Sequence, residues 1–217
     1  MKSIPVLMAT EVDGATRAGL RARALRLEWF TVGWTSLEAI VGITAAIRAS
    51  SVALLGFGAD SVIEVASAGV LIWRLQAERT ATDPAAIRRL DLRAHRLVAF
   101  SLVALAVYIV VDAGLSLWKG GRPHPTLVGI LLTLVTIAVM YWLARAKRQT
   151  AAALDSCSLR ADSFQATACM WLSAITLAGI GLNALFGWWW ADPVAALCMP
   201  VFLIQEARKA WRGESCC

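Results

Sequence analysis

Residues 51–73 read SVALLGFGADSVIEVASAGVLIW, an apolar segment of membrane-spanning length that nevertheless contains two acidic residues, Asp60 and Glu64. A helix rises about 1.5 Å per residue and needs about 20 residues to cross a bilayer. Carboxylates inside such a helix are costly and usually mark a functional site. Because Asp60 and Glu64 are four residues apart, both lie on one helix face. The segment therefore predicts a transmembrane helix that holds a cation.

The rest of the chain has the same apolar character. It contains 217 residues, of which 59% are hydrophobic and 17% are charged, a balance that is unusual for a soluble domain. We expect an all-α membrane protein with a basic N-terminal arm over residues 1–28 that forms an interfacial helix, a membrane domain over 29–208 and a tail over 209–217. Six transmembrane helices are predicted at about 29–47, 51–73, 97–118, 126–144, 158–182 and 188–206.

The distribution of basic residues predicts the orientation. Of the 21 Lys and Arg residues, all but Arg48, Lys119 and Arg122 lie in segments on one side of the predicted spans. The positive-inside rule assigns that side to the cytoplasm, so both termini are expected there, in a multi-pass protein of the cell membrane, in particular a bacterial cytoplasmic membrane. The same rule explains the net charge of +6, so we expect no nucleic-acid partner.

A second polar motif lies in the fifth predicted span. Residues 161–169 read ADSFQATAC, in which Gln165 and Cys169 again have the i, i+4 spacing. Counting 1.5 Å per residue from residues 51 and 159 as the membrane edges places Asp60 level with Cys169, and Glu64 level with Gln165, near the midplane. Two carboxylates, an amide oxygen and a thiolate could form a tetrahedral site for Zn²⁺ or a similar divalent cation.

Each of these residues also has a structural interpretation, which the sequence leaves open. The two acids of residues 51–73 could form a hydrogen-bonded pair between helices. Gln165 could bond across to another helix, and Cys169 could be a small apolar core residue.

Four further acids lie in or near the predicted spans, and no intramembrane Lys or Arg is expected to pair with them. Glu38 and Asp112 are predicted to support the ligands or a water path. Asp162 is expected to line the metal's access path or to cap its own helix. Asp192 precedes a proline and is predicted to cap the sixth helix.

Together these features resemble the cation diffusion facilitators, six-span exporters of divalent metals driven by proton exchange. The resemblance covers the transmembrane domain, and the soluble domain that usually follows in the family is not expected here. It implies a transport site at the positions of Asp60, Glu64, Gln165 and Cys169, and a homodimer. The chain has Glu64 where the family usually has Asp, and Gln165 and Cys169 where zinc-transporting members usually have His and Asp. The resemblance rests on Asp60-x-x-x-Glu64, Arg160-Ala161-Asp162 and Ala191-Asp192-Pro193.

The sequence therefore predicts a secondary active transporter, not an enzyme, that exports a divalent transition-metal cation in exchange for protons. Zn²⁺ is the expected ion, and no cofactor is expected apart from this transported metal. The alternative is a membrane metal-binding sensor or scaffold that does not transport. An enzyme is disfavoured because no HExxH motif, nucleophile with a nearby base or phosphate-binding glycine loop occurs. Whether the terminal Cys216 and Cys217 bind metal stays open.

Overall fold

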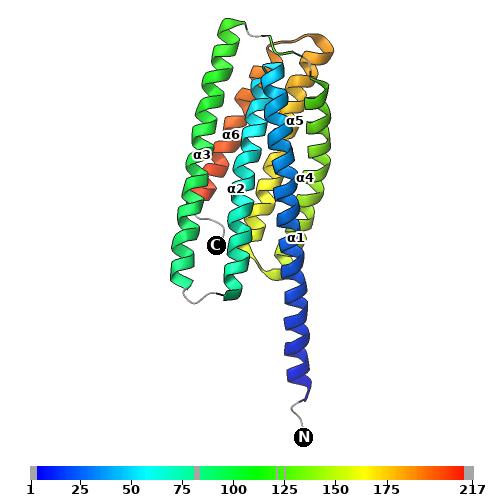
Figure 1. The fold of residues 1–217 in the computed structure, drawn as a ribbon, viewed down its shortest axis with the longest axis vertical. Coiled ribbons are helices and arrows are strands. Elements are labelled where there is room, and N and C mark those ends of the chain that lie inside the picture. The colour runs from blue at the N-terminus through cyan, green and yellow to red at the C-terminus, as the bar shows by residue number, and fades with distance from the viewer. Residues whose placement is uncertain (1–3, 81–83, 121, 125, 213–217) are drawn as a thin grey trace.

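Six helices account for nearly all of the described chain. The computed structural model describes residues 4–80, 84–120, 122–124 and 126–212, and these contain no strand. The helices alternate in direction and form one elongated bundle (Figure 1). Their bounds are α1 Ile4–Ala49, α2 Val52–Thr80, α3 Pro84–Lys119, α4 Leu127–Leu154, α5 Cys157–Phe186 and α6 Ala191–Arg212.

Helix α2 lies at the centre of the bundle. It contacts α1, α3, α5 and α6, while α4 packs against α1 and α5, and α6 packs against α3 and α5. The N-terminus of α1 and the C-terminus of α6 point toward the same end, which we call the terminal end, at the bottom of Figure 1. Because α1 and α5 run away from this end and α2 and α4 run toward it, residues distant in sequence meet at matching depths.

The helix ends follow local sequence signals. Thr126 accepts a hydrogen bond from Gly129 N at 3.2 Å and starts α4, and Ser156 similarly caps α5. Helix α5 ends at Gly187, whose φ of 68° lies in the left-handed region that glycine tolerates. Asp155 adopts the same conformation after α4, with a φ of 49°.

Asp192 caps a different helix from the one predicted. The sequence predicts that it caps α6, but α6 already includes it, and its carboxylate instead accepts hydrogen bonds at the start of α2. Ser51 Oγ donates to it at 2.5 Å and Val52 N at 2.9 Å. The predicted structural role of Asp192 is confirmed, but the prediction of which helix it caps was wrong. Asp192 reaches the start of α2 because the starts of α2 and α6 lie together at one end of the bundle.

All six predicted helices are present, and several extend beyond the predicted spans: α2 continues to Thr80 and α3 begins at Pro84. Helix α1 runs from Ile4 without a break, so the basic arm continues the first span as one helix. Helix α4 continues to Leu154, about ten residues beyond the predicted end of its span. Among the described residues, five helices are long and apolar enough to cross a membrane, and α6, which carries several charges, does not meet that criterion.

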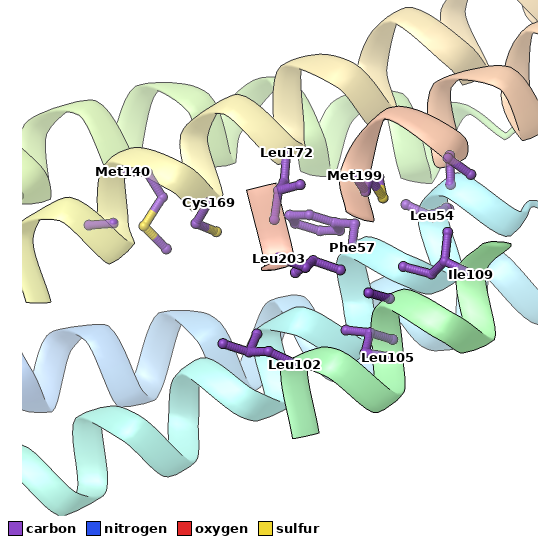
Figure 2. Packing of buried hydrophobic residues seen from close by; sticks show 14 of the residues in the cluster. Leu54, Phe57, Leu102, Leu105, Ile109, Met140, Cys169, Leu172, Met199 and Leu203 are labelled. Carbon is purple, nitrogen blue, oxygen red and sulfur yellow. The ribbon is translucent and has the colours of Figure 1, made fainter. Parts of the chain in front are cut away.

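The apolar core draws on all six helices, and many of its largest buried side chains lie between α2, α3, α5 and α6. Phe57 is buried at its centre, with Ile109, Leu172, Met199 and Leu203 around it (Figure 2). Helices α1 and α2 also cross closely at two glycines. A Cβ on Gly58 would lie 2.9 Å from the backbone N of Ile43, so only glycine fits at this crossing.

Candidate metal centre

Three metal-binding side chains meet inside the bundle, each from a different helix. Glu38 of α1, Glu64 of α2 and Cys169 of α5 each place one ligand atom within 4.8 Å of the others. All three are almost inaccessible, with exposed fractions of 0%, 3% and 2%. We call this group the three-helix cluster. A carboxylate pair and a thiol at this spacing could surround a single ion.

Glu38 is held in place by hydroxyl groups. Thr136 Oγ1 of α4 donates to Glu38 Oε1 at 2.6 Å, and Ser61 Oγ of α2 donates to Oε2 at 3.4 Å. Each carboxylate oxygen can accept more than one bond, so both retain capacity for an ion. Hydrogen bonds of this kind fix the orientation of metal-binding side chains.

Glu64 carries the clearest sign of a missing partner. Its Oε2 atom is buried and has no hydrogen-bond partner in the part of the chain that the structure describes. An unpartnered buried carboxylate oxygen is costly, and an ionised one far more so, unless a cation or proton compensates it. Figure 2 shows Cys169 at one edge of the apolar core beside Met140, so low-polarity surroundings strengthen any charge interaction at the cluster.

The cluster differs by one helical turn from the predicted pairing. Glu64 meets Cys169, whereas Gln165 Oε1 accepts a hydrogen bond from Ser67 Oγ at 3.0 Å. Asp60 is buried one turn from Glu64, toward the opposite end, and lies outside the cluster. The depth count assumed spans of minimal length, but the apolar windows of α2 and α5 extend over 22 and 25 residues. Side-chain contacts, not equal distances from assumed edges, set the register.

A second buried polar group lies nearer the terminal end. Lys147 Nζ of α4 donates to Asp162 Oδ2 of α5 and, at 3.2 Å, to Glu28 Oε2 of α1. All three side chains are buried. We call this group the ion triad. The prediction that Asp162 lacks a basic partner was wrong, because α4 remains helical past residue 144 and directs Lys147 inward.

Sequence reasoning missed Glu28 and Lys147, although both had a signal. On α1 the buried polar residues Glu28, Thr31, Thr35 and Glu38 recur every three or four positions, which marks one inward face. Lys147 lies seven residues, or two turns, after the buried Met140 on the same face of α4. Glu28 fell at the end of the predicted basic arm, and Lys147 fell in the predicted connection after the span that ends at residue 144.

The remaining predicted residues lie elsewhere. Asp112 of α3 is half-buried and belongs to neither group. Cys216 and Cys217 lie outside the described residues.

Comparison with known proteins identifies the family of the chain. The model of the cation efflux transmembrane domain matches residues 31–212, which include every residue of the cluster. The chain belongs to the cation efflux family. The cation-efflux pump FieF of Shewanella oneidensis is 29% identical to it over 112 residues, a match that spans 48% of this chain and 38% of that protein. The predicted resemblance and the all-α membrane bundle are confirmed. Family membership and five apolar helices identify a multi-pass membrane protein of a transporter family.

Proposed function

We propose that this protein exports a divalent transition-metal cation, Zn²⁺ in particular, from the cytoplasm in exchange for protons. The observation that carries the proposal is the unpartnered Glu64 Oε2 within a buried group of two carboxylates and a thiol. Once deprotonated, such a group needs a positive charge, and none of its own members provides one. The matching family domain supports cation efflux as the function of this group of residues.

The donor atoms favour a soft or borderline ion. Glu38 and Glu64 offer oxygen, and Cys169 offers sulfur. Thiolate ligands select ions such as Zn²⁺ and Cd²⁺ over Mg²⁺ and Ca²⁺. Three protein ligands leave a fourth tetrahedral position for water or for another side chain. We propose that Asp60, one turn along α2, takes this position or receives the ion as it leaves. Gln165 Oε1, which accepts a hydrogen bond from Ser67, lies outside this set of ligands.

Proton exchange follows from ligand chemistry. A carboxylate and a thiol bind metal in their deprotonated forms, so an arriving ion releases protons and returning protons release the ion. The terminal end is assigned to the cytoplasm, where the positive-inside rule places most basic residues. The ion then moves from the terminal end to the cluster and leaves past Asp60 toward the opposite end. As in the family it resembles, the chain is proposed to work as a homodimer.

The proposal is tested by Zn²⁺ flux in liposomes containing the purified full-length protein, with a pH-sensitive dye to report proton movement. Glu64→Gln keeps the side-chain size but removes the unpartnered charge, so Zn²⁺ flux should fall to the level of protein-free liposomes. The control Asp112→Asn changes a half-buried acid outside the cluster and should retain flux. Full flux in Glu64→Gln would overturn the assignment. Saturable Zn²⁺ binding without flux in the wild type would identify a sensor or scaffold instead.

A further inference from the structure

The ion triad resembles a cation site in which a lysine takes the place of the ion. Glu28 and Asp162 come from two helices that also supply the three-helix cluster, and the Lys147 ammonium lies between them. The exposed fractions of Lys147 and Glu28 are 1% and 0%. Burying three charged groups is unfavourable unless their charges and hydrogen bonds are matched.

The match in the triad is incomplete. Two carboxylates face one ammonium group, so when both carboxylates are ionised one negative charge has no opposite charge inside the triad. Glu28 Oε1 is also buried without a hydrogen-bond partner in the described part of the chain. A divalent cation between the two carboxylates would balance both charges and provide a partner for Oε1, whereas Lys147 does neither. The carboxylates therefore suit a doubly charged ion better than they suit the ammonium.

The triad also lies on the line that leads to the cluster. Glu28 is ten residues before Glu38 on the buried face of α1, or about 15 Å along the axis. Asp162 is seven residues before Cys169 on α5, or about 10 Å. Both offsets point toward the terminal end, so an ion that follows α1 and α5 from that end meets the triad before the cluster.

We propose that Glu28 and Asp162 form a second site, for a divalent cation on its way to the cluster, where the ion displaces the Lys147 ammonium. The proposal rests on the proposed function, because it concerns the access path of the same cargo. A lysine suits this exchange since its compact charge sits on a flexible four-carbon chain.

The first experiment counts bound ions. Purified full-length protein in detergent is equilibrated with Zn²⁺, and bound metal per chain is measured for the wild type and for Lys147→Met, which keeps the length but removes the charge. Because the tethered ammonium competes with Zn²⁺ for Glu28 and Asp162 in the wild type, Lys147→Met should bind its second Zn²⁺ per chain at a lower Zn²⁺ concentration than the wild type does, and Lys147→Met with Glu28→Gln should lose this gain. Ions held at other sites contribute equally to all three binding curves. A binding curve of folded Lys147→Met that coincides with that of the wild type would overturn the proposal.

The second experiment covers the case in which Lys147→Met does not fold. Glu28→Gln leaves the Asp162 and Lys147 pair intact but removes one carboxylate from the second site. The KM for Zn²⁺ flux should rise about tenfold, because ligand charge tunes affinity for an ion, while equilibrium Zn²⁺ affinity at the cluster stays within about threefold. The matched control Asp155→Asn, an exposed acid at the same end, should leave both values unchanged. An unchanged KM in Glu28→Gln would contradict the second site alone, whereas flux that survives Glu64→Gln would contradict the proposed function.

Discussion

The three-helix cluster and the ion triad are built from similar parts but differ in their source of positive charge. Each takes a glutamate from α1 and a second ligand from α5, and each has a buried carboxylate oxygen without a partner. The triad contains Lys147, a cation that is covalently part of the chain. In the cluster the third member is instead Glu64 of α2, which is a further carboxylate. A cation that is part of the chain stabilises a site but must move before the transported ion can bind. A site without such a cation depends on the transported ion for its positive charge.

This difference also separates the roles of α2 and α4. Helix α2 contributes Glu64 to the cluster and nothing to the triad. Helix α4 contributes Lys147 to the triad and only the Thr136 hydroxyl to the cluster. A change in the packing of α2 should therefore affect the cluster alone, and a change in the α4 register should reach both groups.

The largest expected effect on Zn²⁺ affinity appears when the α1 glutamate of each group is changed to glutamine and the two variants are compared. Glu38→Gln removes a charged ligand from the cluster and should lower equilibrium Zn²⁺ affinity by about 100-fold, near the upper end of effects seen around metal sites. Glu28→Gln, ten residues earlier, should leave that affinity nearly unchanged. Isothermal titration calorimetry on both purified variants makes the comparison. Equal losses in the two variants would mean that the groups act as one site.

The next effect concerns ion selectivity. Cys169→Ser replaces the soft sulfur ligand by a hard oxygen, so the ratio of Cd²⁺ to Mn²⁺ affinity should fall about tenfold or more. Cys198→Ser is the matched control, because Cys198 is an exposed free cysteine on α6. Competition between the two ions for the purified protein gives the ratio directly. An unchanged ratio in Cys169→Ser would remove the thiol from the ligand set and leave the cluster with carboxylates only.

A smaller effect is expected from the hydroxyl that orients Glu38. Thr136→Val removes the donor at 2.6 Å from Glu38 Oε1 while it keeps the side-chain shape, so Zn²⁺ affinity should fall about tenfold. Thr133→Val is the matched control one turn earlier on α4, since its hydroxyl bonds only to the carbonyls of its own helix, at Gly129 and Ile130. Identical Zn²⁺ affinities in the two variants would show that Glu38 needs no support from α4.

The fold could be predicted from sequence because the lengths of the apolar segments and the positions of the charged residues determine where the helices lie. Six apolar blocks gave six helices, and the acids in residues 51–73 marked the helix that lies at the centre of the bundle. Glu64 and Cys169 were identified as site residues from their place in apolar segments, and the structure brings them together.

What failed was the alignment between helices. Depth counted along separate helices cannot fix their relative register to within one turn, because span lengths differ and helix contacts decide the final position. The depth count paired Glu64 with Gln165, whereas the structure places Glu64 beside Cys169 and Glu38. Lys147 was missed for another reason: a basic residue near a span end is assigned to the membrane surface unless the helix continues beyond it, and α4 does continue.

The smallest expected effect on the metal tests the packing of α2 without touching any ligand. Gly58→Ala would place a Cβ 2.9 Å from the backbone N of Ile43, so α1 and α2 must separate slightly, at a cost of about 1–3 kcal/mol in stability. Because this crossing lies about one turn from Glu38, Zn²⁺ affinity should fall a few-fold. The control Gly69→Ala, at an open position on the same helix, should preserve both the stability and the Zn²⁺ affinity. If Gly58→Ala lowered thermal stability but left Zn²⁺ affinity intact, the cluster would tolerate a small separation of α1 and α2, and the close glycine crossing would serve stability alone.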